Sequence, residues 1–229
     1  MYIPILKTRK IEMKVLKDLN YCFSDSIIPM FETIDNSYEF NTILTLLNGN
    51  KAFLDLFRFS TCKYGERIDI TKAEYSWKIT NDKELYISEL KKIDNNIGFI
   101  PVISIKKHLE IGSTALYELI KELQEKHDSI AFRFTDEFMN KYNNLFSQLR
   151  TSDYLMMDIE EQNSESKFIE IDEFLDFEIE CKKIILNSHL LPFFQIVLVI
   201  HLKAPVCTRK NLLQTNSSSQ KPAYTGSSH

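Results

Sequence analysis

Charged and polar side chains stand within or just after short apolar runs along this 229-residue chain. Asp55 and Arg58 are the sharpest cases, because both lie in a run made otherwise of Phe and Leu, and an unpaired buried charge is costly. In a regular strand these two side chains point to opposite faces, so we expect that they do not pair with each other. The full set is Lys7, Glu32, Asp55, Arg58, Ser104, Arg133, Asp158, Glu160 and His189.

Several carboxylates that face two or three cations could perform general acid–base chemistry, bind a divalent cation or hold a phosphate. We assign catalytic roles to Glu32, Asp55, Arg133 and Asp158, and ligand contacts to Lys7, Arg58, Ser104, Glu160 and His189. No metal ligand is assigned, and the cofactor is unknown, with a divalent cation as a candidate. The competing interpretation is that strands end in polar residues because they leave the core, and that these charges pair with one another.

Sequence motifs that name a reaction are missing. The chain contains no Walker loop, G-x-G-x-x-G, H-E-x-x-H or G-x-S-x-G motif. With only five glycines, phosphate-cradling loops are not expected. The four cysteines form no C-x-x-C pair, which favours free thiols in a reducing cytosol and a cytoplasmic location.

Composition argues against two broad classes of function, although a local basic patch stays open. A net charge of -4 argues against a non-specific nucleic-acid binder, which would carry a basic excess. The most apolar window, Leu190 to Leu202, is interrupted by Pro192, Gln195 and His201, and it is shorter than the roughly 20 residues that cross a bilayer. We therefore expect no membrane segment. No signal peptide is expected either, because Met1 leads directly into a strand-like run.

Seven apolar runs predict β-strands, and helical periodicity separates most of them. Between them, a helix is predicted over Phe40–Leu47, one is capped by Asp82, one opens at Ser113, one is capped by Asp136, and an acidic one covers Ile171–Cys181. The strands are expected at Tyr2–Lys7, Ile27–Glu32, Phe53–Phe59, Phe99–Ile105, Ser129–Phe134, Tyr154–Ile159 and Lys183–Ser188.

The repeated strand–helix alternation predicts an α/β fold with one parallel sheet. We favour a TIM-barrel-like arrangement, incomplete at its end, and the alternative is an open, doubly wound parallel sheet. In either fold the carboxyl ends of the strands gather at one edge, which is where the polar set above would meet.

We expect one barrel-like domain over residues 1–203, with an insertion at about 60–80 in which Ile68–Thr71 and Tyr75–Ile79 form a hairpin. Phe194–Leu202 is either the outer helix after the seventh strand or an antiparallel strand. Residues 204–229 are rich in Ser, Asn and Gln and are expected to be a disordered tail. Its last four residues, Gly226–His229, look like a fusion scar.

A family resemblance rests on several short motifs. Two segments resemble the Beta protein family of phages, satellite phages and prophages. They are the opening Tyr2-Ile3-Pro4-Ile5-Leu6-Lys7-Thr8-Arg9 and the later Ile28-Pro29-Met30-Phe31-Glu32. Four shorter segments resemble the same family in the kind of residues they contain: Phe53-Leu54-Asp55, Pro101-Val102-Ile103, Ala131-Phe132-Arg133 and Met157-Asp158. The resemblance covers roughly residues 1–190. Members of the family are usually longer, so it stays open whether this chain forms an intact eighth strand–helix unit.

The resemblance implies an association with mobile elements and anti-phage defence gene clusters, and no particular reaction. We therefore expect a phage- or prophage-encoded component of anti-phage defence whose partner is a protein from the same gene cluster. The alternative is a barrel-type hydrolase that acts on a phosphodiester or another phosphorylated substrate at the carboxyl ends of the strands. Whether the chain is an enzyme stays open at this stage.

Overall fold

Seven parallel strands form one sheet in the computed structural model. The structure describes residues 1–8, 12–14, 17, 26–34, 40–58, 73–95, 98–107, 109–160, 162 and 164–187. The strands lie side by side in chain order, and every neighbouring pair is parallel. They are β1 (Ile5–Lys7), β2 (Met30–Thr33), β3 (Ala52–Leu56), β4 (Phe99–Ile105), β5 (Ala131–Thr135), β6 (Tyr154–Asp158) and β7 (Lys182–Leu186).

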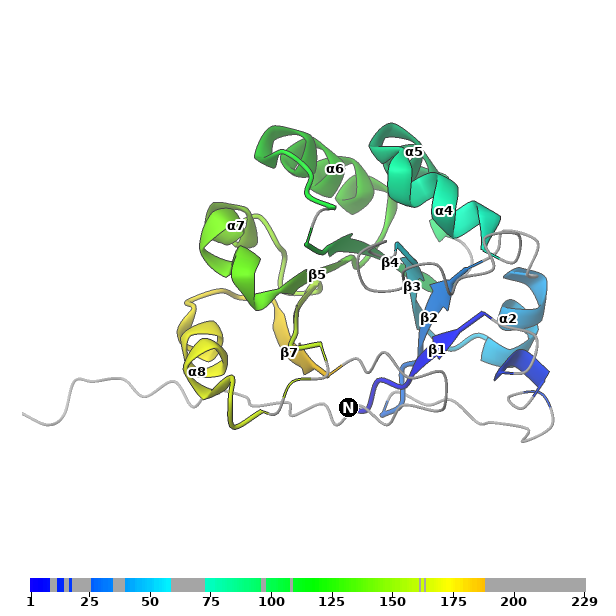
Figure 1. The fold of residues 1–229 in the computed structure, drawn as a ribbon. Helices are drawn as coiled ribbons and strands as arrows, with labels where there is room; N and C mark the ends of the chain where they lie inside the picture. The colour runs from blue at the N-terminus through cyan, green and yellow to red at the C-terminus, as the bar shows by residue number, and fades with distance from the viewer. Residues whose placement is uncertain are drawn as a thin grey trace, which may run out of the picture.

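The sheet curls into a half-barrel, and the helices lie on its convex side (Figure 1). This confirms the expected α/β fold with an incomplete TIM-barrel-like arrangement. The helical elements are α2 (Phe40–Leu47), α4 (Glu74–Asn81), α5 (Lys83–Lys91), α6 (Ser113–Lys126), the 3₁₀ turn η4 (Asp136–Phe138), α7 (Met139–Phe146) and α8 (Phe168–Asp176).

Contacts across the concave side show the curvature directly. Phe53 of β3 and Tyr154 of β6 pack edge to face with ring centroids 4.9 Å apart, although two strands separate them in the sheet. In a flat sheet three inter-strand steps would hold them roughly 14 Å apart. The strands therefore enclose an interior, which is apolar near their amino ends, where Ile3, Met30 and Ile100 are buried.

The convex side of the sheet makes the larger core. Phe132 and Phe134 of β5 pack against Phe146 of α7, with ring centroids 5.9 and 5.0 Å away. The apolar face of α6 is fully buried against the same cluster, and it consists of Leu116, Leu119, Ile120 and Leu123. Within the described residues, no helix combines the length and apolar composition needed to cross a membrane.

Two helix boundaries follow the sequence closely. Helix α2 covers the predicted range and ends at Asn48 and Gly49, which adopt left-handed φ values of 45° and 84°. Asp82 caps α5, because its carboxylate accepts a hydrogen bond of 2.8 Å from the amide of Leu85. Short polar residues with these roles mark helix ends reliably.

Three local predictions were wrong. Tyr75–Ile79, expected as a strand, lies in α4, where Ser76 docks the helix by donating to the carbonyl of Ile34 at 2.8 Å. Asp136 does not cap α7 but opens the 3₁₀ turn, and its carboxylate binds Lys167 at 2.6 Å. The acidic helix α8 begins at Phe168 and ends at Asp176, before Cys181.

Several predictions concern parts of the chain beyond the described residues. These parts are Ile68–Thr71, the segment 194–202 and the tail 204–229. The division into one domain, an insertion and a tail therefore stays a prediction. Cys181 is a buried free thiol, which is the state expected for the cysteines.

Candidate functional site

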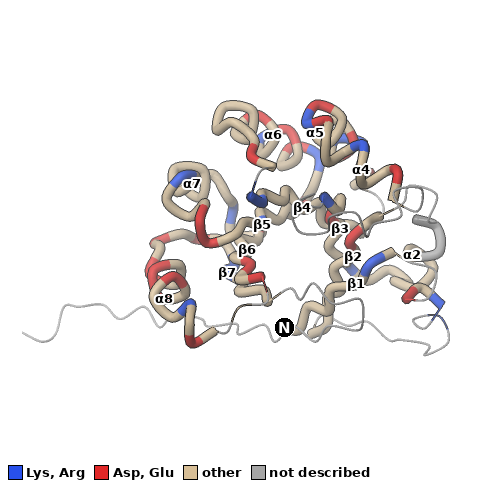
Figure 2. Tube along the Cα trace, in the orientation of Figure 1, with Lys and Arg blue, Asp and Glu red and all other residues tan. Residues whose placement is uncertain are grey.

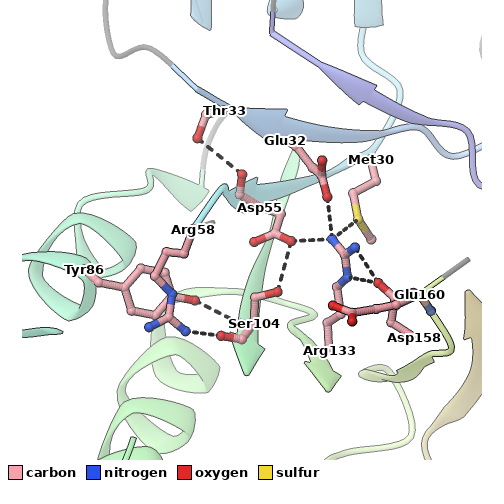
Figure 3. Close-up of polar contacts among 10 residues, drawn as sticks. All are labelled: Met30, Glu32, Thr33, Asp55, Arg58, Tyr86, Ser104, Arg133, Asp158 and Glu160. Carbon is pink, nitrogen blue, oxygen red and sulfur yellow. Dashed lines mark hydrogen bonds and ion pairs between the residues drawn. The ribbon is translucent and has the colours of Figure 1, made fainter. Parts of the chain in front are cut away.

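Arg133 of β5 gathers three carboxylates inside the half-barrel (Figure 3). Its Nη1 donates to Glu32 Oε1 at 2.8 Å and to Asp55 Oδ2 at 2.6 Å. Its Nη2 and Nε both donate to Asp158 Oδ2, at 2.6 and 3.0 Å. The four residues, named here the charged layer, come from the four strands β2, β3, β5 and β6.

The strand pattern explains why these side chains meet. Successive residues of a strand alternate between faces, so Met30 and Glu32 point to the same side of β2, as do Ala131 and Arg133 on β5. The first member of each pair belongs to the apolar interior, and the second lies one step nearer the carboxyl end. The parallel register sets Glu32 directly beside Asp55. The charged layer therefore lies on top of the apolar interior.

All four residues of the charged layer are buried. Glu32 is 3% exposed, Asp55 0%, Arg133 2% and Asp158 2%. Burial by itself raises the pKa of Glu32, but the charges of Arg133, Lys106 and Lys7 outweigh it and hold this pKa below its ordinary value. Burial likewise opposes the charge on Arg133, yet the three carboxylates raise its pKa well above the usual value. Both groups are therefore ionised at neutral pH.

Ser104 of β4 joins the charged layer to a second cation, Arg58. The hydroxyl of Ser104 donates to Asp55 Oδ2 at 3.1 Å, and its carbonyl accepts a hydrogen bond from Arg58 Nη2. The guanidinium of Arg58 stacks on the ring of Tyr86, 3.7 Å from its centre. Asp55 and Arg58 thus contact different atoms of Ser104.

Two further details mark this region. The Oδ1 atom of Asp55 is buried and accepts no hydrogen bond from any described residue. Glu160, just after β6, has a φ of 42°, which is unusual for a residue other than glycine. Its amide donates to Asp158 Oδ1 at 3.0 Å, so the turn holds the second oxygen of that carboxylate.

Two lysines lie at the rim of the charged layer. Lys7 is the last residue of β1, and Lys106 follows β4 directly. Each ammonium group lies 4.8 Å from the centre of the Phe57 ring. Burial, and after it the charge of Arg133, lowers the pKa of Lys106, while the nearby carboxylates raise it.

Of the residues predicted from sequence, the structure brings Glu32, Asp55, Arg133 and Asp158 into direct contact and places Lys7, Arg58, Ser104 and Glu160 around them. His189 lies outside the described residues. Lys106 was missed, because the apolar run ends one residue before it. The alternation of Val102, Ser104 and Lys106 on one face of the strand would have indicated its inward direction.

Arg133 occupies the position between the three carboxylates that a bound cation would otherwise take. Elsewhere, too, no group of three or more His, Cys, Asp or Glu side chains among the described residues is arranged to hold a metal ion. Chemically, the region presents three carboxylates held in place by a guanidinium, with the ammonium groups of Lys7 and Lys106 nearby. Figure 2 shows acidic and basic positions next to one another on the strands of the half-barrel.

Comparison with known proteins gives one positive result. No curated protein and no solved structure matches the chain. A family model, described as Beta protein, matches residues 2–177, which is more than half of the 229 residues and includes every member of the charged layer. On this match, the chain belongs to the Beta protein family.

Proposed function

We propose that the charged layer is the functional centre of this Beta-family protein, and that the protein acts through it as a phage- or prophage-encoded component of anti-phage defence. Membership of the family supports the biological setting, through the association with mobile elements and defence clusters that the resemblance implies. The geometry of Arg133 and its three carboxylates supports the position of the centre. The proposal includes a cytoplasmic location and a partner protein from the same cluster.

The observation that carries the proposal is the burial of three carboxylates around one guanidinium, with Lys7 and Lys106 as further cations nearby. Three carboxylates share one guanidinium, and removing each charge from water costs several kcal/mol. Apolar side chains of similar volume would fill the interior with equal or greater stability. A protein that keeps such a cluster at the carboxyl ends of its strands, where parallel α/β folds bind and convert ligands, has a functional reason for it.

Two local features strengthen this interpretation. A buried carboxylate oxygen without a hydrogen-bond partner among the described residues, as at Asp55, requires an explanation in any folded protein. A left-handed backbone at a non-glycine residue, as at Glu160, is a conformation that concentrates at active sites and ligand clamps. Both occur in direct contact with the charged layer.

A second candidate function is hydrolysis of a phosphodiester or another phosphorylated substrate. The observation that favours it is the combination of fixed carboxylates with the ammonium of Lys106 next to them. Asp55 would serve as the proton acceptor, because its Oδ1 has acceptor capacity that no described residue uses. Arg133 would fix Asp55 and Asp158 in position. Hydrolysis of an activated aryl phosphodiester by the purified chain tests this candidate.

Asp55→Asn and Asp158→Asn test the main proposal. Each change keeps the shape and one acceptor oxygen, and Arg133 keeps two carboxylates, so we expect the fold to be retained with a loss of about 1–3 kcal/mol in the free energy of unfolding. We expect each variant to lose protection in a phage-plaquing assay with cells that carry the whole gene cluster. The matched control is Asp172→Asn on the exposed face of α8, which should keep full protection.

Denaturant melts on the same three variants separate loss of function from loss of fold. If both buried variants fail to fold, the charged layer serves stability alone, and the proposal is wrong. Full protection by both folded variants would overturn it as well.

A further inference from the structure

Lys7 and Lys106 differ from the other half-buried lysines among the described residues. Five lysines within the described residues are half-buried: Lys7, Lys91, Lys106, Lys167 and Lys183.

Three of these five have polar partners. Lys91 pairs with Glu122 at 2.6 Å, and Lys167 pairs with Asp136 at 2.6 Å. Lys183 donates to the carbonyls of Leu175 and Phe177. Lys7 and Lys106 form neither an ion pair nor a hydrogen bond with any described residue, and their ammonium groups instead face one aromatic ring, that of Phe57. Both half-buried cations therefore contact the Phe57 ring without a direct ion pair or hydrogen bond to any described residue, although their charges act on Glu32 at longer range.

The carboxylates closest to these lysines are already bound. Glu32, Asp55 and Asp158 all accept hydrogen bonds from Arg133 at 3.0 Å or less. Arg133 is planar and can donate to several carboxylates at once, whereas a lysine ammonium acts as a point charge. Because Arg133 binds the acidic groups directly, the two ammonium groups act on them only at longer range. An anion from outside would form the direct ion pairs that Lys7 and Lys106 lack among the described residues.

We propose that Lys7 and Lys106 bind a doubly charged anion of the phosphate class above the ring of Phe57, at the carboxyl end of the half-barrel. This inference rests on the proposed function, since it assigns a ligand to the same end of the sheet. A phosphate monoester or inorganic phosphate carries a charge of about −1.5 to −2 at pH 7 and three acceptor oxygens, so it can form a charge-assisted hydrogen bond with each ammonium group. A carboxylate or a phosphodiester, with a single charge, would attract the two ammonium groups less strongly.

The ring of Phe57 contacts both ammonium groups in the absence of ligand. A cation over an aromatic face gains about 0.5–1 kcal/mol when partly exposed, which is enough to orient each ammonium group. A phosphate oxygen in a charge-assisted hydrogen bond replaces that contact with a stronger one. Phe57 follows β3, so the three residues of the site come from the ends of β1, β3 and β4.

Titration of the full-length chain with inorganic phosphate, followed by calorimetry at constant ionic strength, tests the inference. Lys7→Met and Lys106→Met keep an apolar stem over the Phe57 ring and should fold normally in a thermal melt. Each should weaken phosphate binding about tenfold or more, as expected for loss of a hydrogen bond to a charged group. The control is Lys107→Met, which changes the adjacent, exposed lysine and should leave the affinity unchanged. Acetate and dimethyl phosphate should bind more weakly than phosphate.

Two results would overturn this inference. One is an absence of phosphate binding to the unmodified chain, and the other is an equal affinity in the Lys7, Lys106 and Lys107 variants. Either result leaves the role of the charged layer to be decided separately by the plaque assay on Asp55→Asn and Asp158→Asn. Conversely, phosphate binding that depends on Lys7 and Lys106 stands even if those aspartate variants keep their protection.

Discussion

Arg133 determines the electrostatics of the interior of the half-barrel. It makes contacts of 2.6–2.8 Å with carboxylates from three other strands, and so lies within ion-pair distance of all three. Without it, three buried carboxylates would repel one another in a region of low dielectric constant. Its contribution to stability should therefore exceed that of any single carboxylate.

Arg133→Met is expected to lower the free energy of unfolding by about 3–5 kcal/mol, the usual result when one partner of a buried ion pair is removed. The free energy of unfolding of Arg133→Lys should lie between those of Arg133→Met and the unmodified protein, because lysine keeps the charge but cannot reach all three carboxylates. Urea denaturation followed by circular dichroism measures both values. Equal stability of the Met variant and the unmodified protein would show that the carboxylates are neutral in the fold.

The pH dependence of the free energy of unfolding should have opposite signs in the unmodified protein and in Arg133→Met. In the unmodified protein the pKa of Glu32 is lowered in the folded state, so its contribution is fully present above its unfolded pKa of about 4.3 and is lost as the pH falls through the folded value. In Arg133→Met the uncompensated carboxylates should have raised pKa values, so stability should rise as the pH falls from 7 to 5. Urea midpoints from pH 7 down to about pH 3 measure both trends.

At the level of single residues, the sequence identified the members of the charged layer but not their interactions. Glu32, Asp55, Arg133 and Asp158 could be selected because each interrupts or ends an apolar run. That Arg133 joins all three carboxylates depends on the curvature of the sheet, which no local pattern contains. Their catalytic roles stay a prediction.

Among the secondary-structure elements, α4 shows how tertiary contacts override a local pattern. The alternation of Tyr75, Trp77 and Ile79 resembles a strand, yet the segment is helical. Ser76 is fully buried, and its amide and hydroxyl both donate to the carbonyl of Ile34, at the end of β2. A helix lets Ser76 and Ile79 share one buried face, and the sequence does not show that this face would be covered.

The cap of α5 gives a prediction at this scale. Asp82→Ala removes the carboxylate that accepts from the amide of Leu85 at 2.8 Å, and it should cost about 1 kcal/mol in the free energy of unfolding. Glu84→Ala is the matched control, because Glu84 is an acidic residue in the first turn of the same helix but does not cap it. Denaturant melts should show a clearly smaller loss for Glu84→Ala. Equal losses would indicate that charge near the helix end matters rather than the cap.

For the whole molecule, the strand–helix alternation predicts parallel strands paired in chain order. It does not predict that the sheet curls. The same pattern of buried runs fits an open sheet with helices on both faces. The contact between Phe53 and Tyr154 and the reach of Arg133 from β5 to Glu32 on β2 exist only because the sheet curls. Inward residues large enough to meet across the interior favour the curved form, since a flat sheet would leave that face uncovered.

This architecture predicts an order of local stability across the sheet. All seven residues of β4 are buried, and β4 pairs with a strand on each side, whereas β7 is partly exposed and pairs among the described strands with β6 alone. Amide hydrogen exchange should therefore be slowest in β4 and β5, close to the rate set by global unfolding, and faster in β7 and β1.

The charged layer should couple the local stabilities of the four strands that contribute to it. Because Arg133 links β2, β3, β5 and β6, Arg133→Lys should reduce protection in these four strands together. A loss of protection confined to β5 would show that each strand holds its carboxylate independently of the others. Mass spectrometry of exchanged peptides from both proteins distinguishes the two outcomes, because each strand lies on a different segment of the chain.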